Sequence, residues 1–241
     1  MDFQDIKFPA TLEVTEQTID ISGISDSQKR HYFDFAAEIS VFYALQKKPR
    51  ALVGVCGAAG SGKSVLAEIT KYVIRQMGAP FRFEHITLDA FHYTNSYLIS
   101  HALKDFKGRS DTYDVEKFVD CLKKFKGGEA ILFPAYSRKI HEPVESTISI
   151  QEEHVLLLVE GQWLLRATGG WGELRKLFDI MYYIDSDADK VRSGVIERHI
   201  AGGRNREDAI RQFEKNDLLN YIEITKDSVR ADKTLPAYYN L

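Results

Sequence analysis

A short glycine-rich segment carries the clearest chemical signal in this sequence. Residues 57–64 read GAAGSGKS and match the phosphate-binding pattern GxxxxGK[ST]. Several backbone N–H groups must turn inward together to bind phosphate oxygens, and a loop poor in side chains allows this. Lys63 would place a positive charge near the β- and γ-phosphates, and the Ser64 hydroxyl offers an oxygen ligand to Mg²⁺. The segment therefore predicts a site for a nucleoside triphosphate with magnesium.

Two carboxylates follow apolar runs and are candidates for the remaining chemistry. Asp89 comes directly after the run 85–88, and Glu160 ends the run 155–159. Ligands of open parallel sheets bind at the carboxyl ends of strands, so both carboxylates should face one crevice. We expect Asp89 to accept an alcohol proton during phosphoryl transfer, and Glu160 to orient magnesium waters or Lys63. A helix cap at Asp89 and a structural ion pair at Glu160 are the competing interpretations.

The segment after the last expected core strand argues against a guanine-binding switch protein. Such proteins carry an NKxD-type segment after a later strand, whereas residues 185–189 here read DSDAD. Guanine specificity is therefore unsupported, and the carboxylates favour a kinase.

Strand and helix patterns alternate along the chain and would hold these residues in place. The apolar run 51–56 precedes the glycine-rich loop, and residues 64–77 continue with helical periodicity. The same order recurs, with strands expected over 85–88, 154–159 and 179–184 and helices over 115–125, 187–200 and 206–224. Such alternation predicts an α/β fold with a parallel sheet and helices on both faces.

The first fifty residues are predicted to form an extension of the core. Alternating runs at 10–14 and 17–21 predict a small hairpin. Ser25 and Gln28 form a capping box ahead of a helix to about Leu45. The aromatic residues of this helix are expected to pack in the core, with a homodimer face as the alternative. We expect one domain over residues 1–241, with the hairpin and helix extension over 1–50 and the kinase core over 51–241.

The overall composition excludes several classes of protein. The 241 residues include 32 basic and 35 acidic side chains, a net charge of −3, and 44% are hydrophobic. No global field therefore draws the chain to nucleic acid or anionic lipid, and the composition is not that of a disordered chain. No window approaches the ~18 apolar residues of a spanning helix, and no signal peptide is recognisable, so we expect a cytoplasmic protein. Cys56 and Cys121 match no metal or redox spacing and are expected to be free buried thiols.

Five segments, taken in order, resemble a known group of kinases. They are residues 57–64, 88–92 (LDAFH), 107–114 (KGRSDTYD), 134–138 (PAYSR) and 159–161 (VEG). Over roughly residues 51–232 the chain resembles the P-loop kinase group that contains uridine kinase, bacterial pantothenate kinase and phosphoribulokinase. Within this group it is most similar to a poorly characterised bacterial branch, some members of which are named as fructose-transport-associated kinases. The resemblance implies a three-layer α/β/α P-loop NTPase fold with a mainly parallel central sheet and a small helical lid. It also implies ATP and Mg²⁺ as cofactors and transfer to the hydroxyl of a small molecule.

The resemblance extends to individual residues. Asp89 matches the catalytic base of the group, Arg198 matches an arginine directed at the transferring phosphates, and Arg204 falls in the lid. The expected catalytic residues are Lys63, Asp89, Glu160 and Arg198, and the expected metal ligands are Ser64 and Glu160. The expected nucleotide-binding residues are Gly57, Ala58, Ala59, Gly60, Ser61, Gly62, Lys63, Ser64, Val65 and Arg204. The expected acceptor-binding residues are Asp89, His92, Asn95, Lys107, Tyr136, Arg138 and His141.

Departures from the pattern of the group bear on the acceptor. Uridine kinases carry Asp where Ser137 stands and Arg where Pro143 stands, which removes two expected nucleoside contacts. Pantothenate kinases carry His where Arg138 stands and Tyr where His141 stands. We therefore expect an ATP-dependent kinase of a small metabolite, a sugar or related polyol, with no nucleic-acid or membrane partner. A nucleoside or pantothenate kinase is one alternative, and a nucleotide-binding regulatory protein without transfer activity is another.

Overall fold

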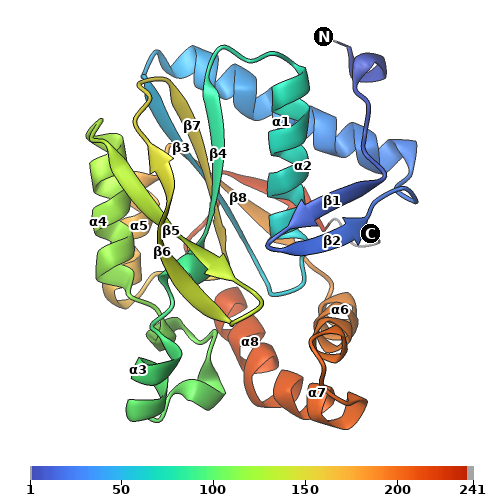
Figure 1. Cartoon of the computed structure of the whole chain (residues 1–241), viewed down its shortest axis with the longest axis vertical. Coiled ribbons are helices and arrows are strands. Elements are labelled where there is room, and N and C mark those ends of the chain that lie inside the picture. Colours follow the sequence, from blue (N-terminus) through green and yellow to red (C-terminus); the bar gives the residue numbers. More distant parts are fainter. Residues whose placement is uncertain (1, 238–241) are drawn as a thin grey trace.

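A five-stranded sheet forms the centre of the computed structural model, which describes residues 2–237 (Figure 1). Its strand order is β4-β7-β3-β8-β9, and every neighbouring pair is parallel. The strands are β3 (Arg50–Gly57), β4 (Arg82–Thr87), β7 (Val155–Gly161), β8 (Ile180–Asp185) and β9 (Lys233–Pro236). The predicted parallel sheet is confirmed, and β9 adds an edge strand that the sequence analysis did not predict.

Helices cover both faces of this sheet. The helices α1 (Asp26–Gln46) and α2 (Lys63–Gln76) share one apolar core with it, and α4 (Val115–Lys126), α5 (Leu174–Leu177) and α8 (Leu218–Lys226) share the other. Alternate residues of β3 divide between the two cores, since Val53 packs in the first and Leu52 in the second. Both faces of the sheet are therefore buried, which explains why the sequences of β3 and β7 are almost continuously apolar. The three-layer α/β/α fold is confirmed.

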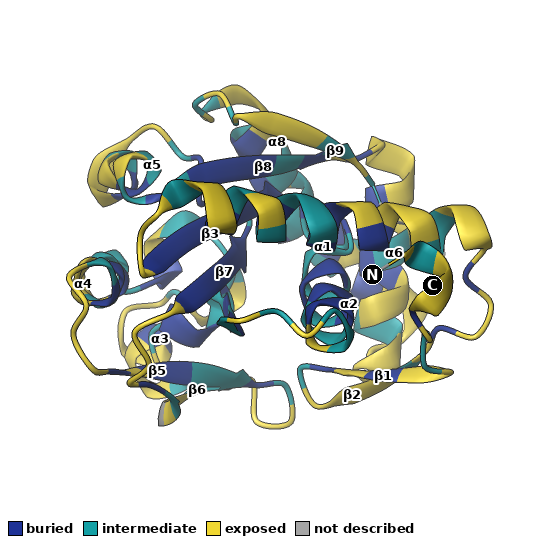
Figure 2. Cartoon of the chain, turned by 90° about the horizontal axis from the view of Figure 1, so that it is seen from above, coloured by how far each residue is buried: buried dark blue, intermediate teal, exposed yellow. Residues whose placement is uncertain are grey.

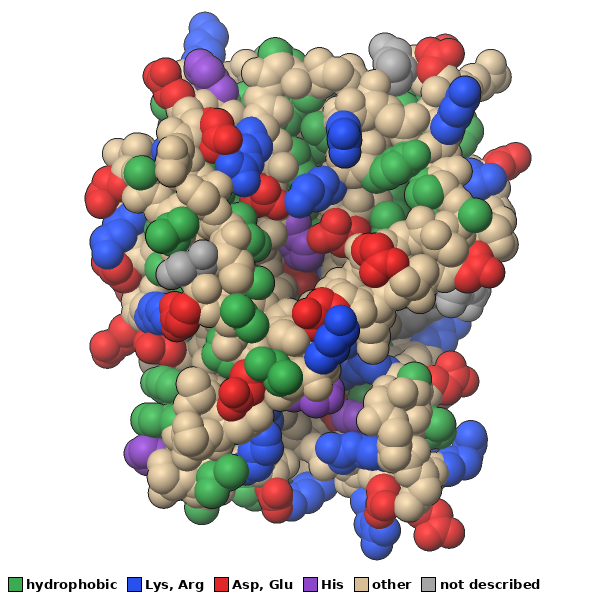
Figure 3. All heavy atoms as spheres, viewed as in Figure 1, with side chains coloured by type: hydrophobic (Ala, Val, Ile, Leu, Met, Phe, Trp, Pro, Cys, Tyr) green, Lys and Arg blue, Asp and Glu red, His purple; other side chains and the backbone are tan. Residues whose placement is uncertain are grey.

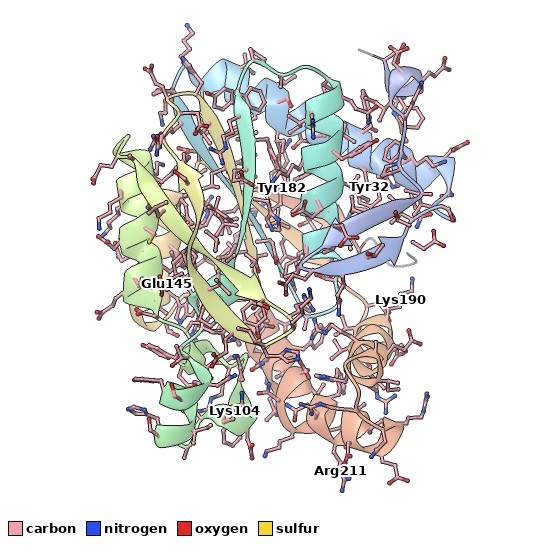
Figure 4. All side chains as sticks on the ribbon, viewed as in Figure 1. Tyr32, Lys104, Glu145, Tyr182, Lys190 and Arg211 are labelled. Carbon is pink, nitrogen blue, oxygen red and sulfur yellow. The ribbon has the colours of Figure 1, made fainter. Side chains whose placement is uncertain are left out.

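The N-terminal extension packs onto the first of these cores. The hairpin of β1 (Thr11–Val14) and β2 (Gln17–Asp20) turns at Thr15 and Glu16, both of which adopt positive φ angles. Ser25 caps α1 as expected, because its side chain accepts from the backbone N–H of Gln28 while the Gln28 side chain accepts in return. The aromatic side chains Tyr32, Phe33, Phe35 and Tyr43 of α1 are buried, whereas other residues of this helix are exposed (Figure 2). Tyr32 is labelled in Figure 4, and the Phe35 ring lies 5.1 Å from the Tyr182 ring of β8. The core interpretation of these side chains is confirmed.

A second antiparallel sheet covers the carboxyl end of β4. It consists of β5 (Ile131–Ser137) and β6 (Glu142–Ile150), and the short helix α3 (Asn95–Ser100) lies near it. The sequence analysis predicted none of these elements. The turn of this hairpin meets the turn of the N-terminal hairpin, where the Ser137 hydroxyl donates to a Glu16 carboxylate oxygen at 2.7 Å. Single-turn helices complete the chain at Phe3–Asp5, Leu88–Phe91, Lys104–Phe106, Ser110–Thr112 and Gly169–Glu173.

Two helices form an arm beyond the carboxyl edge of the sheet (Figure 1). They are α6 (Ala188–Ala201) and α7 (Arg206–Gln212), and Val191 and Val195 of α6 pack with Ala58 of the glycine-rich loop. The predicted helix over 206–224 is confirmed as a continuous helical segment in which a π-helical turn at Phe213–Asp217 joins α7 to α8. The wider turn carries a buried asparagine, Asn216, whose side-chain amide hydrogen-bonds a loop described below.

Three further expectations concern the chain as a whole. Cys56 and Cys121 are free thiols, but only Cys56 is fully buried. The described part of the chain contains no helix with the length and apolar character needed to cross a membrane. The predicted domain limits, residues 1 and 241, lie outside the described residues, and the one-domain organisation stays a prediction.

Candidate active site

The glycine-rich loop joins β3 to α2 in a conformation that depends on its glycines. Gly60 and Gly62 have φ angles of 74° and 87°, which side chains disfavour. A Cβ atom at Gly57 would lie only 2.9 Å from the Ser61 hydroxyl. That hydroxyl is buried and has no hydrogen-bond partner among the described residues. The loop precedes an α2 N-terminus with no side-chain cap, so backbone N–H groups remain available for an anion.

Lys63 lies in the first turn of α2 and folds back over the loop. Its ammonium donates a hydrogen bond to the Ala58 carbonyl at 2.8 Å. Burial lowers the pKa of Lys63, and the nearby carboxylate of Glu160 opposes this effect. Among the described residues, the Ala58 carbonyl is the one hydrogen-bond acceptor of this ammonium, and phosphate oxygens could replace it.

Ser64 and Glu160 meet directly, as expected for two ligands of one ion. The Ser64 hydroxyl donates to Glu160 Oε1 at 2.9 Å, and Glu160 lies at the end of β7, next to β3 in the sheet. Burial alone would raise the pKa of Glu160, but the proximity of His85 and Lys63 lowers it to about 2. The carboxylate is therefore ionised at pH 7.

A histidine that the sequence analysis did not select supports this carboxylate from β4. His85 Nε2 lies 3.8 Å from Glu160 Oε1, and its Nδ1 lies 2.9 Å from a Glu68 oxygen on α2. Burial by itself would lower the pKa of His85, but the two carboxylates outweigh it and raise the pKa to about 9. At the start of the expected strand 85–88 this histidine carried a weak signal, because a polar residue in a strand does not reveal its partners.

Asp89 occupies the turn that follows β4. Its side chain is 40% exposed, and Oδ1 accepts a hydrogen bond from the Tyr113 hydroxyl at 3.3 Å. Burial, followed by the charge of Asp89, raises the pKa of Tyr113, so this hydroxyl keeps its proton and donates it. The strand register places this turn at the same end of the sheet as the Lys63 loop, because Thr87 of β4 pairs with Glu160 and Glu160 pairs with Val55 of β3. Thr87, and not Asp89, caps the turn, so the cap interpretation of Asp89 is wrong.

His92 lies beneath Asp89 and is packed between rings. Its Nδ1 contacts the Asp89 carbonyl at 3.0 Å, and its ring centroid lies 3.8 Å from that of Tyr113 and 5.8 Å from that of Tyr136. Burial lowers the pKa of His92 to about 4, so the ring is neutral at pH 7. Only 7% of the residue is exposed.

The other predicted acceptor residues come together beside Tyr136. Lys107 donates to the Asn95 side-chain oxygen at 3.1 Å and to the His141 carbonyl, and its ammonium lies 5.5 Å from the Tyr136 ring centroid. Arg138 stands directly after β5, and its Nε is buried without a hydrogen-bond partner among the described residues. The segment after α3 and the β5–β6 turn therefore form one polar cluster.

The predicted arginines extend this cluster from the arm. Arg198 lies on α6 and is exposed, and its charge adds to the burial that lowers the pKa of Lys63 and opposes the burial that raises the pKa of Tyr136. Arg204 follows α6 and is exposed, and its charge contributes to lowering the pKa of His141. Figure 3 shows the surface hollowed in this region, with basic side chains and histidines around the hollow. The predicted nucleotide, base and acceptor residues thus border one region.

Magnesium fits the oxygen atoms that this region presents. Mg²⁺ in phosphoryl-transfer sites is held by one or two protein oxygens, with phosphates and water completing the shell. The ionised Glu160 carboxylate and the Ser64 hydroxyl provide such oxygens 2.9 Å apart. Across residues 2–237 no group of three or more His, Cys, Asp or Glu side chains forms an independent metal site. A metal here would therefore depend on the phosphates of a bound nucleotide.

Comparison with known proteins agrees with this geometry. Residues 52–236 match the sequence model of the phosphoribulokinase / uridine kinase family. The chain belongs to this family. It is a P-loop kinase and therefore a phosphotransferase, and kinases of this family use ATP, usually with Mg²⁺.

Individual relatives of this kinase differ in what their names say of the acceptor. It is 31% identical over 194 residues to the uncharacterised protein YggC of Escherichia coli K12, covering 80% of this chain and 81% of YggC. It is 25% identical over 211 residues to the pantothenate kinase of Streptococcus mutans, covering 87% of this chain and 66% of that enzyme. Among solved structures, a Silicibacter sp. TM1040 protein provisionally named a fructose transport system kinase superposes with a TM-score of 0.75 at 26% identity. That match covers 83% of this chain and 98% of the Silicibacter protein.

Proposed function

We propose that this kinase transfers the γ-phosphoryl group of ATP to a hydroxyl of a small metabolite of the sugar or polyol class, with Asp89 as the general base. The observation that carries the proposal is the Asp89 carboxylate, which is 40% exposed beside the Lys63 loop and has Tyr113 as its hydrogen-bond donor. Phosphoryl transfer needs mainly positioning and charge stabilisation, and a carboxylate can accept the hydroxyl proton late in the reaction.

The proposed reaction assigns one task to each group. The acceptor hydroxyl oxygen forms a bond to the γ-phosphorus while its proton passes to Asp89. The bond from the γ-phosphorus to the bridging oxygen breaks, and ADP leaves. Lys63, 2.8 Å from the Ala58 carbonyl in the free loop, turns to the β- and γ-phosphates, and Arg198 approaches the transferring group from α6.

Ser64 and Glu160 would hold the magnesium ion in this reaction. When bound, Mg²⁺ neutralises phosphate charge. The role of the chain is to keep Glu160 ionised, which the neighbouring His85 and Lys63 favour, and to fix the Ser64 hydroxyl in the first turn of α2. We also propose that residues 1–241 act as one domain, since the extension shares an apolar core with β3 and α2.

The proposal is tested by ADP release from ATP and Mg²⁺ with a panel of sugars, polyols, sugar acids, nucleosides and pantothenate. We expect one acceptor class to accelerate ADP release strongly. Nucleoside or pantothenate turnover would instead support the first alternative, although Ser137 and Pro143 depart from the uridine kinase pattern. ATP binding without transfer to any acceptor would favour the regulatory alternative.

The base assignment has its own test. We expect Asp89→Asn to lower kcat by roughly 10²-fold or more, the usual scale for a lost general base, while ATP affinity stays nearly unchanged. Asn can still accept the Tyr113 hydrogen bond, so the local fold should persist. Asp34→Asn, at a 53% exposed position on α1, provides the matched control. Unchanged turnover in Asp89→Asn would remove this residue from the role of base.

A further inference from the structure

The polar cluster beside Tyr136 contains cations that form no ion pair among the described residues. Lys104 and Lys107 both donate to the side-chain oxygen of Asn95, which is a neutral acceptor. In the described part of the chain, neither lysine has a carboxylate oxygen within 4.0 Å, and the same is true of Arg138 and Arg204. Figure 4 labels Lys104 on the α3 side of this region.

Nearby carboxylates are engaged elsewhere. Glu142 Oε1 accepts the backbone N–H of Asn95 at 2.5 Å, and Asp89 accepts from Tyr113. Both carboxylates act on Lys107, but burial and the charge of Lys104 outweigh them and lower its pKa to about 8. Neither carboxylate forms an ion pair with Lys107 among the described residues, so its ammonium is held only by the neutral oxygens of Asn95 and His141.

Burial makes this arrangement costly for a free protein. Lys107 is half-buried, and the Arg138 Nε is enclosed without a hydrogen-bond partner. A cation removed from water without a partner costs free energy, and such groups are retained where a ligand or a reaction uses them. Exposed lysines elsewhere on the chain do pair, as Lys117 does with Glu145 at 2.6 Å. An ordinary solvated surface does not explain the unpaired Arg138 Nε.

The ring of Tyr136 has Lys107 and the histidine next to the proposed base, His92, as neighbours. The Lys107 ammonium is 5.5 Å from the Tyr136 ring centroid, and the His92 ring centroid is 5.8 Å from the centroid of the same ring. His92 Nδ1 in turn lies 3.8 Å from Asp89 Oδ1. A molecule lying along Tyr136 could therefore present a hydroxyl to Asp89 and a second group to Lys107 and Arg138.

We propose that the phosphoryl acceptor carries an anionic group, a carboxylate or a phosphate, that Lys107 and Arg138 bind while its hydroxyl faces Asp89. The inference rests on the proposed function and names the class of its substrate. Arg138 suits either anion, since a guanidinium donates to two oxygens at once, and Lys107 adds a point charge. Neutral sugars and polyols would leave both cations unpaired.

The loop that carries Lys107 is held in place for this task. The Asn216 amide of the π-helical turn donates to the Lys107 carbonyl at 2.8 Å. Gln162 and the Trp163 indole both donate to the Gly108 carbonyl, at 2.5 and 2.9 Å. Because the loop is already ordered before the ligand binds, binding costs less conformational entropy. Asn216 is thus a positioning residue that acts through the backbone of Lys107.

Pairs of acceptors that differ only in charge test the proposal. We compare kcat/KM for glycerol and glycerate, for sorbitol and gluconate, and for fructose and its 6-phosphate. The two anion types distinguish a carboxylate site from a phosphate site. We expect at least one anionic member to exceed its neutral partner by about 10²-fold, because a charged hydrogen bond contributes ~1.5–3 kcal/mol. Equal or better turnover of every neutral member would overturn the proposal.

Arg138→Gln tests the residue itself. We expect the variant to lower kcat/KM for the preferred anionic acceptor by roughly 30-fold and to lower kcat/KM for its neutral partner several-fold less. Lys139→Gln, at the exposed next position, is the matched control. Equal losses for both acceptors, or no loss for either, would contradict the assignment.

A binding measurement separates this inference from the proposed function. Calorimetry with glycerate, gluconate and fructose 6-phosphate, in the presence of Mg²⁺ and a non-hydrolysable ATP analogue, needs no turnover. Binding that Arg138→Gln abolishes, together with no transfer to any acceptor, would overturn the kinase proposal and keep the anion site. Binding that is equally strong in Arg138→Gln would overturn the anion site alone, and so would no binding of any of the three anions.

Discussion

Replacing Lys63 with methionine removes one positive charge from the glycine-rich loop and keeps the length of the side chain. The ammonium has one hydrogen bond, to the Ala58 carbonyl, and burial has already lowered its pKa. The substitution should therefore change the free energy of unfolding of the unliganded protein only slightly. In the complex, a unit charge about 4 Å from a phosphate oxygen is worth ~4 kcal/mol at an effective dielectric constant of about 20. Each 1.4 kcal/mol is tenfold in affinity, so binding should weaken by about 10²- to 10³-fold.

Calorimetry with Mg²⁺ and a non-hydrolysable ATP analogue measures this loss without an acceptor. Arg75→Met is the matched control, because Arg75 is an exposed cation on the same helix, twelve residues from Lys63. At 1.5 Å per residue it lies about 18 Å along the axis, beyond the Debye length of about 8 Å at physiological salt. We expect its affinity to match that of the wild type. Folded Lys63→Met protein that binds within threefold of the wild type would refute the loop assignment.

Two further predictions concern glycine packing and a buried arginine. Gly161→Ala would put a Cβ atom 2.4 Å from the Leu88 Cβ, so the turn that carries the proposed base must shift, and we expect turnover to fall about tenfold or more with ATP binding kept. Gly23→Ala, with no atom within 4 Å, should have no effect, and full activity of Gly161→Ala would contradict the packing argument. Arg50→Met should lower the free energy of unfolding by about 3 kcal/mol or more in urea, because the guanidinium donates to three backbone carbonyls at 2.6–3.0 Å. Exposed Arg30→Met should cost less than about 1 kcal/mol, and a similar cost for both arginines would show that the buried bonds are not needed.

The nucleotide half of the site could be predicted from local sequence. A loop that wraps phosphate needs glycines at Gly60 and Gly62 with positive φ angles, and these stand within a few residues of Lys63 and Ser64. The end of a strand can also be predicted from neighbouring residues. The apolar run 155–159 was therefore enough to predict that Glu160 lies at a strand end. The structure agrees, since the Ser64 hydroxyl lies 2.9 Å from Glu160 Oε1.

The acceptor half was predicted only as scattered candidates from the resemblance. Lys107, Tyr136 and Arg138 come from a loop and a hairpin, and no periodic pattern relates such positions. The hairpin itself was missed, because buried and exposed residues do not alternate regularly along β5 and the pairing of β5 with β6 has a register shift. His85 was missed for the same reason, because its partner Glu160 lies 75 residues away in the sequence. The contact of Asn216 with Lys107 was likewise not predicted, because 109 residues separate them.

The sequence by itself determined the fold class, the phosphate loop and the strand-end carboxylates, because each depends on contacts between near neighbours or on simple periodicity. Only the tertiary structure decided which charges stay unpaired. Lys107 and Arg138 look like ordinary surface cations in the sequence, and their lack of a carboxylate partner follows from how β5, β6 and the π-helical turn pack around them. Electrostatic pairing depends on distances in space, which the order of residues along a chain does not contain.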